Sequence, residues 1–118
     1  MAKYIMMVRS NPLPGRDDEY NDWYDRHALP RFVATPTIVA AQRYKLAPVE
    51  PPDYPGYEKA KHRYMVMYEI ETDSLERTKQ IVWSPENIGR MPASTAFDAS
   101  SVDCQFYLPC GRRVTKDD

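Results

Sequence analysis

The sequence contains little cysteine and little histidine. Cys104 and Cys110 are the only two cysteines, and they lie six residues apart in or just beyond a predicted strand. Extended chain would separate their Cα atoms by roughly 20 Å, so no disulfide is expected between them. The two cysteines and two histidines match no zinc-binding spacing. We therefore expect no metal site and a reducing, cytoplasmic location.

The chain also lacks long hydrophobic runs and an excess of charge. The apolar run at residues 5–8 is too short for a signal peptide, and no run reaches the length of a membrane span. Net charge is −1, without a cluster of Lys and Arg. Nucleic acids and anionic membranes are therefore not expected partners. Residues 111–118 are predicted to be a polar tail, after a single domain at residues 1–110.

Aromatic residues are abundant by contrast. The 118 residues include nine tyrosines, two tryptophans and six methionines. Tyrosine favours an apolar setting with a polar tip, so this composition suits a site for a flat, partly polar organic ligand. It equally suits a large protein–protein interface.

The most distinctive segment is a predicted helix over residues 17–29. At about 100° per residue, one side of that helix collects three aromatic side chains and an imidazole: Tyr20, Trp23, Tyr24 and His27. Hydroxyl, indole and imidazole groups need polar partners when buried, which is typical of a pocket wall. A hydrogen-bonded core histidine is the alternative interpretation. Pro30 is expected to end or kink the helix, before a short helical piece at residues 31–34.

The remaining pattern predicts an α+β fold. The expected elements are a strand at 3–9, the helix at 17–29, strands at 38–46 and 63–71, a helix at 75–83 and a strand at 101–108. This order is the split βαβ, or ferredoxin-like βαββαβ, pattern: a four-stranded antiparallel sheet with two helices on one face. Residues 86–100 are expected to be irregular.

Two features predict a homodimer. The strand at residues 63–71 is apolar on both faces, yet two helices cover only one face of the sheet. A second copy of the chain is the simplest cover for the other face. The proline-rich loop at residues 47–62 is long enough to be a lid or a dimer clasp.

Several segments in the first half of the chain resemble a known family. They are NPLPG at 11–15, EYNDWY at 19–24, HALP at 27–30 and AQRY at 41–44. These segments resemble the EthD-like branch of the dimeric α+β barrel proteins. The resemblance implies ferredoxin-like protomers that pair sheet to sheet, and a ligand cavity between the sheet and the helices of each protomer. Members include muconolactone isomerases, polyketide cyclases, dehydratases, decarboxylases and cofactor-free monooxygenases, while others bind haem.

The resemblance also implies roles for residues of the first helix. In several relatives a histidine at the end of this helix faces the cavity, and His27 matches that position. His27 would then be the general acid–base, since imidazole titrates near neutral pH. Tyr24 would hydrogen-bond a substrate carbonyl or phenol, or simply pack on the sheet. Tyr20 and Trp23 would form part of the cavity wall.

Other candidate substrate-binding residues lie in strands and in the long loop. Tyr44 and Tyr68 are expected to face either the cavity or the dimer interface, because the sequence does not define strand register. Arg43 would bind a substrate carboxylate or pair with Glu69, and we favour the pair. His62 would lie at a pocket mouth or be an exposed loop histidine.

These expectations predict a cofactor-independent lyase or isomerase. It would move a proton on a small aromatic, lactone or polyketide-like substrate, in a dehydration, cyclisation, decarboxylation or isomerisation, with neither metal nor organic cofactor. One alternative is a cofactor-free monooxygenase in which Trp23 or Trp83 lines the oxygen site. The other is a non-catalytic protein that binds a hydrophobic small molecule or haem. The sequence leaves the substrate open, since a fold shared by many chemistries names none of them.

Overall fold

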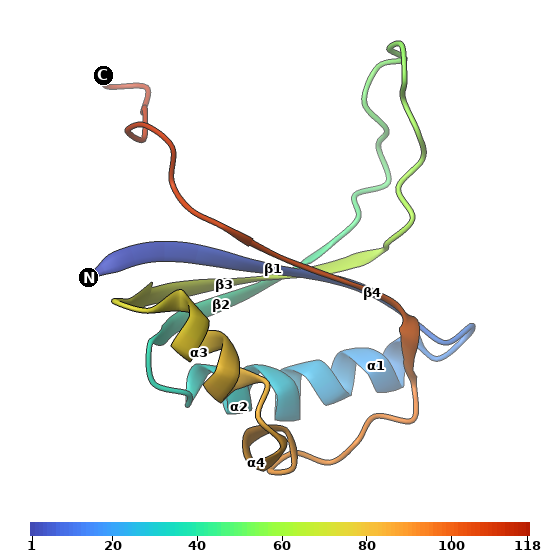
Figure 1. The fold of residues 1–118 in the computed structure, drawn as a ribbon. Coiled ribbons are helices and arrows are strands. Elements are labelled where there is room, and N and C mark those ends of the chain that lie inside the picture. Colours follow the sequence, from blue (N-terminus) through green and yellow to red (C-terminus); the bar gives the residue numbers. More distant parts are fainter.

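The computed structural model describes all residues 1–118 and contains one antiparallel sheet with helices on one face (Figure 1). The strands are β1 (Ala2–Pro12), β2 (Ile38–Lys45), β3 (Tyr64–Thr72) and β4 (Phe97–Tyr107), in the sheet order β2-β3-β1-β4. The helices are α1 (Asp17–Trp23), a π-helical turn (Tyr24–Ala28), α2 (Leu29–Val33), α3 (Leu75–Val82) and α4 (Pro85–Ile88). The predicted α+β class, element order and ferredoxin-like topology are confirmed.

The first helix is longer than predicted, because Pro30 does not end it. The segments α1, the π-helical turn and α2 follow one another without a break from Asp17 to Val33. In the wider π turn, the backbone N–H of Leu29 donates to the carbonyl of Tyr24, five residues back. Pro30 has no N–H to place in the next turn. A proline directly after a widened turn is therefore compatible with a continuous helix.

The π turn also decides which residues of the helix face the sheet. The buried residues follow a spacing of four: Tyr20, Tyr24, Ala28 and Phe32. In a pure α-helix a four-residue step advances by about 40° beyond one turn, so the buried stripe would drift. The wider turn cancels part of that drift and keeps the stripe on the sheet. His27 consequently lies beside the buried stripe and is half-buried.

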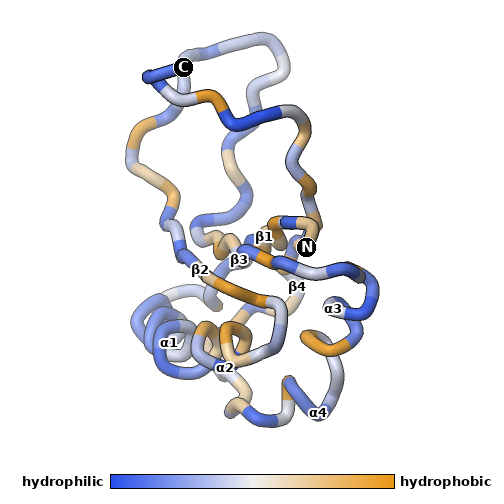
Figure 2. Tube along the Cα trace, turned by 90° about the vertical axis from the view of Figure 1, so that its left-hand side faces the viewer, coloured by the Kyte–Doolittle hydropathy of each residue, from blue (hydrophilic) through white to orange (hydrophobic).

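The inner face of the sheet forms the core with these helices. Cross-strand pairs such as Met6 with Tyr68, and Val8 with Val66, are buried on this face. Figure 2 shows hydrophobic segments in the strands and in the helices α2 and α3 below them. Between α4 and β4, residues 89–96 cross the open end of the helical layer. We call this segment the strap.

The outer face of the sheet has no helical cover. Its central side chains are apolar and only half-buried, and they come from neighbouring positions of β1 and β3: Ile5, Met7, Met65 and Met67, of which Met7 and Met67 are paired in register. Two segments rise from this side of the sheet, the loop arm (residues 47–62) and the tail arm (residues 108–118) (Figure 1). The loop arm therefore points away from the helical layer, and the interpretation of it as a lid over that layer is wrong.

The two arms leave the protomer extended. Its radius of gyration is 16.0 Å, against about 13–14 Å for a compact domain of this length. Both arms carry exposed apolar side chains, including Val49 at 79% exposure and Leu108 at 70%. Cys104 is half-buried and Cys110 exposed, and both are free thiols. None of the helices has the length and apolar character needed to cross a bilayer.

Candidate functional site

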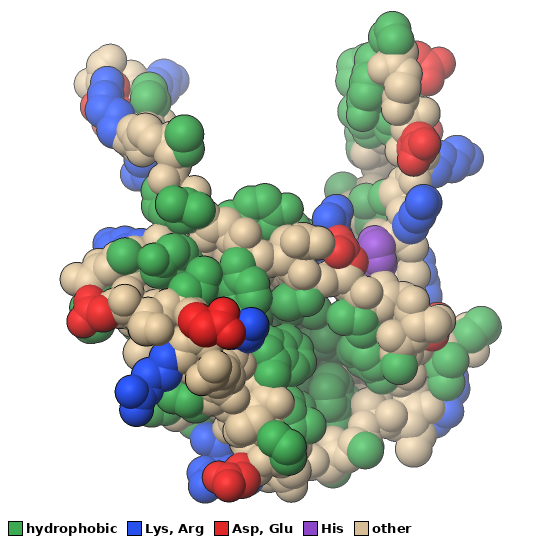
Figure 3. All heavy atoms as spheres, in the orientation of Figure 1, with side chains coloured by type: hydrophobic (Ala, Val, Ile, Leu, Met, Phe, Trp, Pro, Cys, Tyr) green, Lys and Arg blue, Asp and Glu red, His purple; other side chains and the backbone are tan.

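A cavity of about 510 Å³ lies between the inner face of the sheet and the helical layer. Fifteen residues line it and twelve of them are hydrophobic. Figure 3 shows the hollow below the sheet, with hydrophobic side chains gathered in it. The volume falls within the range of pockets that hold small organic molecules.

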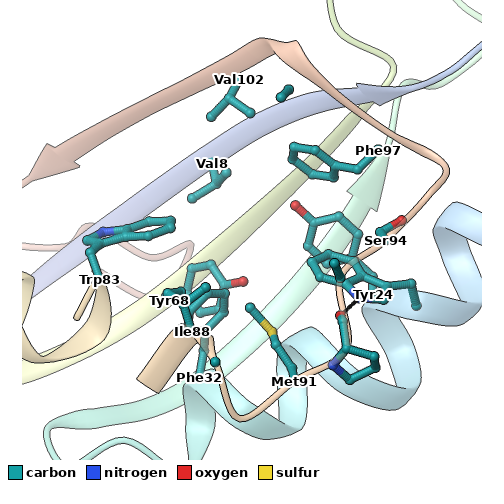
Figure 4. A pocket seen from close by; sticks show the side chains of 15 residues that line it. Val8, Tyr24, Phe32, Tyr68, Trp83, Ile88, Met91, Ser94, Phe97 and Val102 are labelled. Atoms are coloured by element: carbon teal, nitrogen blue, oxygen red, sulfur yellow. Dashed lines mark hydrogen bonds between the residues drawn. The ribbon is translucent and has the colours of Figure 1, made fainter. Parts of the chain in front are cut away.

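Each layer of the fold supplies one wall of the cavity (Figure 4). The sheet contributes Val8, Tyr68, Phe97, Ala99 and Val102, and the first helix contributes Trp23, Tyr24 and Phe32. The remaining wall comes from Trp83 and Ile88 near the ends of α3 and α4, and from the strap at residues 89 and 91–94. The chain's only two tryptophans therefore both line the cavity.

Two phenol hydroxyls are the main polar groups at the cavity. Tyr68 is only 1% exposed, and its hydroxyl forms no hydrogen bond with the protein and lies toward the open space (Figure 4). Tyr24 is also buried, and its hydroxyl lies 3.5 Å from the Oγ of Ser10. Burial raises the pKa of both phenols, that of Tyr68 well above its usual range. Both hydroxyls are therefore neutral at pH 7 and able to donate hydrogen bonds to a ligand.

Arg43 lies behind the cavity wall instead of inside the cavity. Its guanidinium donates to Asn21 (2.7 Å) and Asp25 (3.1 Å) and lies 4.9 Å from the ring centroid of Tyr24. The favoured pairing with Glu69 is wrong. Strand register explains the error, because Arg43 pairs with Val66 on the inner face while Glu69 points to the outer face.

Three other predicted site residues also lie outside the cavity lining. Tyr20 is a core residue whose hydroxyl bonds to Ser10. Tyr44 pairs in register with Met65 on the outer face and is half-exposed. His62 lies at the base of the loop arm, with its Nε2 2.8 Å from the carbonyl oxygen of Ser101. Strand alternation and the direction of the loop arm separate Tyr44 and His62 from the cavity.

His27 borders a different depression from the one that the sequence predicts. It lies in a shallow polar groove on the outside of the helix, with Glu19, Asp22 and part of the strap. It is absent from the cavity lining, so the predicted position inside the cavity is wrong. The helix turns Tyr24 and Ala28 toward the sheet, and His27 lies beside this buried stripe. The groove and the cavity share Trp23 and strap residues 92–94 as a common wall. A catalytic role for His27 stays a prediction.

Comparison with solved structures identifies the fold. The crystal structure of an EthD family protein from Bacillus halodurans superposes with a TM-score of 0.58, covering 93% of this chain and 100% of that chain at 13% sequence identity. The chain has the EthD-like fold. No family model matches the sequence, and no curated protein matches it.

The strap is the part of the cavity wall that the sequence did not predict. The expectation that residues 86–100 are irregular is wrong at both ends, because α4 continues to Ile88 and β4 begins at Phe97. Met91, Pro92 and Phe97 line the cavity, and Ala96 is buried. A methionine and a phenylalanine in a stretch without periodicity were the available signal. The end of the strap is held by backbone hydrogen bonds to distant segments, such as that from the N–H of Leu13 to the carbonyl of Ala96 at 2.7 Å.

Proposed function

We propose that the protein is a cofactor-independent lyase or isomerase that binds a small, flat, largely apolar molecule with phenol, enol or carbonyl oxygens. The observation that carries this proposal is the pair of neutral phenols, Tyr24 and Tyr68, in an otherwise apolar cavity of about 510 Å³. Such a lining favours aromatic rings, while the two hydroxyls orient the oxygens of the ligand.

The phenols suit reactions that build negative charge on oxygen. When a proton leaves a carbon next to a carbonyl, or a ring hydroxyl, the electrons come to rest on oxygen as an enolate or phenolate. Fixed donors aimed at that oxygen stabilise the charge more in an apolar cavity than in water. Tyr24 and Tyr68 would supply these donors, because burial keeps them protonated.

The proposed general acid–base is His27. No carboxylate, lysine or histidine lines the cavity, and His27 lies on the other side of the wall formed by Trp23 and the strap. Access to a bound substrate would require this shared wall to shift. Imidazole suits proton transfer in both directions near neutral pH.

The absence of a titratable base from the lining favours a second candidate, a non-catalytic carrier or sensor of the same class of molecule. Binding is common to both candidates. Turnover that depends on His27 separates them, and an anaerobic assay separates proton transfer from cofactor-free oxygenation.

We also propose that two protomers pair through the outer faces of their sheets. The half-buried apolar side chains of that face, the two arms beside it and the extended protomer support this pairing. Sheets that pack face to face lie about 10 Å apart. A second sheet at this distance would lie between the two arms, whose exposed apolar residues would then contact it.

Tryptophan fluorescence tests the binding proposal directly, since both tryptophans line the cavity. The probe is 4-nitro-1-naphthol, a flat phenol whose nitro group quenches indole emission. We expect saturable quenching, and affinities weaker by about 3-fold to 30-fold in Tyr24→Phe and Tyr68→Phe, the usual effect of losing one hydrogen bond to a ligand.

Tyr64→Phe is the matched control. Tyr64 belongs to the same aromatic cluster, but its hydroxyl donates to Asp17 (2.8 Å) and it does not line the cavity. Its affinity for the probe should equal that of the unmodified protein. Quenching that fails to saturate, or an equal loss in all three variants, would contradict the proposed site.

A further inference from the structure

Three hydroxyl groups lie in a row that ends at the cavity. The hydroxyl of Tyr20 is 2.5 Å from the Oγ of Ser10, and this Oγ is 3.5 Å from the hydroxyl of Tyr24. Ser10 and Tyr20 are each 1% exposed. A serine on the inner face of β1, among aromatic rings, is costly unless its hydroxyl is hydrogen-bonded.

The proton count sets the direction of this row. The Tyr20 hydroxyl has two hydroxyl partners, Ser10 and Tyr24, and is otherwise surrounded by rings such as those of Tyr64 and Phe97. If Ser10 donates to Tyr20, the Tyr20 proton turns to the oxygen of Tyr24. If Tyr20 donates to Ser10, the Ser10 proton turns to the oxygen of Tyr24. In both arrangements the Tyr24 oxygen accepts, so the proton of Tyr24 is directed to the cavity and a ligand oxygen completes the row.

Arg43 also affects the phenol of Tyr24, from the side of the cavity wall that faces away from the cavity. Its guanidinium lies 4.9 Å from the ring centroid of Tyr24, fixed by hydrogen bonds to Asn21 and Asp25. A cation over the ring draws electron density from the hydroxyl and makes its proton a better donor. Burial raises the pKa of Tyr24, while the Ser10 hydroxyl, the Arg43 charge and the Tyr20 hydroxyl lower it. The three lowering effects favour donation to an anion.

We propose that Tyr20 and Ser10 form a donor relay that fixes Tyr24 as a hydrogen-bond donor, so that the cavity selects ligands with a phenolate, enolate or carbonyl oxygen at that position. Ser10 is a positioning residue, since it acts through Tyr24. This inference rests on the proposed function and narrows its ligand class. The second phenol is not equivalent, because the Tyr68 hydroxyl has no protein partner and is free to donate or accept.

The relay predicts how a bound phenol ionises. 4-Nitro-1-naphthol changes its visible absorption when it loses its proton, so the fraction of phenolate in the saturated complex is measured directly against pH. A fixed donor stabilises the bound phenolate. In Ser10→Ala we expect the ionisation constant of the bound probe to fall by about 3-fold to 10-fold, the typical effect of one neutral hydrogen bond.

A second readout separates the relay from a purely structural role of Ser10. 1-Nitronaphthalene has the same rings without the hydroxyl, and a loosened cavity would lose affinity for both probes equally. The relay predicts that Ser10→Ala lowers the preference for the naphthol over 1-nitronaphthalene, and that Ser10→Thr keeps it. Tyr20→Phe should lower this preference too, since it removes a hydroxyl of the relay. If Ser10→Ala does not fold, Tyr20→Phe replaces it in the experiment. Tyr64→Phe should change neither readout.

The outcomes distinguish this inference from the proposed function. If the unmodified protein does not bind the naphthol, the proposed function and the relay are both wrong. If it binds, and Ser10→Ala or Tyr20→Phe shows unchanged ionisation and preference, only the relay is wrong.

Discussion

The indole N–H of Trp23 donates to the carbonyl oxygen of Pro92 across 2.6 Å, and this hydrogen bond joins the first helix to the strap. The two residues belong to the wall that the cavity shares with the groove of His27. A ligand that enters past the strap, or a proton that passes between groove and cavity, has to cross this wall. If the proposed function holds, the strength of this hydrogen bond affects both ligand access and proton transfer.

Trp23→Phe keeps a ring in the wall and removes the N–H donor. We expect faster association and dissociation of 4-nitro-1-naphthol, and a loss of about 1 kcal/mol in the free energy of unfolding. Stopped-flow quenching of the remaining Trp83 measures the rates. Trp83→Phe is the control, because Trp83 lines the cavity without bonding to the strap. Equal rates in the two variants would show that the Trp23–Pro92 bond does not control access.

His27→Ala tests the proposed acid–base. Because His27 is half-buried and forms no hydrogen bond through its ring, the melting temperature and the affinity for the naphthol should be almost unchanged. Turnover of a substrate of this class should fall by about two to four orders of magnitude, the usual effect of losing a positioned proton-transfer group. His62→Ala, at the base of the loop arm, is the matched control. Unchanged turnover in His27→Ala would favour the carrier.

Met67→Lys tests the proposed pairing of protomers. Met67 lies at the centre of the outer face, in register with Met7 and Gln42, and faces away from the cavity. In the dimer, the lysine charge would be buried between the two sheets. The free-energy cost of burying it should prevent the dimer from forming. Light scattering should give twice 13.7 kDa for the unmodified protein and 13.7 kDa for the variant. A single-chain mass for both would refute the pairing.

The buried tyrosines predict a loss of stability at alkaline pH. Burial raises the pKa of Tyr20, Tyr24 and Tyr68 above the ordinary value of 10.0. Above about pH 10 the unfolded chain therefore binds fewer protons than the folded protein, so the free energy of unfolding falls as pH rises. Each tyrosine contributes a slope of at most about 1.4 kcal/mol per pH unit, and below about pH 9 it contributes none.

Urea unfolding between pH 8 and pH 11 measures this slope. Tyr68→Phe should flatten it without breaking a native hydrogen bond, since the Tyr68 hydroxyl has no protein partner. Tyr54→Phe changes an exposed tyrosine of the loop arm and should leave the slope unchanged. The same slope in all three proteins would mean that Tyr68 ionises as readily in the folded protein as in the unfolded chain.

The sequence by itself determined the four strands, the two main helices and their order, but not the short helix α4. The apolar run of β3 and the aromatic stripe of the first helix are local patterns, and local patterns define strands and helices. The order of these elements leaves few topologies, so the ferredoxin-like sheet followed. Trp23, Tyr24, Tyr68 and Trp83 line the cavity, but the sequence left open which way Tyr68 faces, because it does not define strand register.

The tertiary structure decided the positions that depend on register and on distant contacts. One widened turn keeps Tyr24 on the buried stripe and leaves His27 beside it, and no propensity signals such a turn. Because side chains alternate along a strand, Arg43 lies on the inner face of the sheet and Glu69 on the outer face. A shift of one residue in strand register would move each to the opposite face. The strap closes the cavity through bonds between residues more than sixty positions apart, such as Trp23 and Pro92. A chain encodes its local preferences residue by residue, whereas a cavity exists only where separate segments meet.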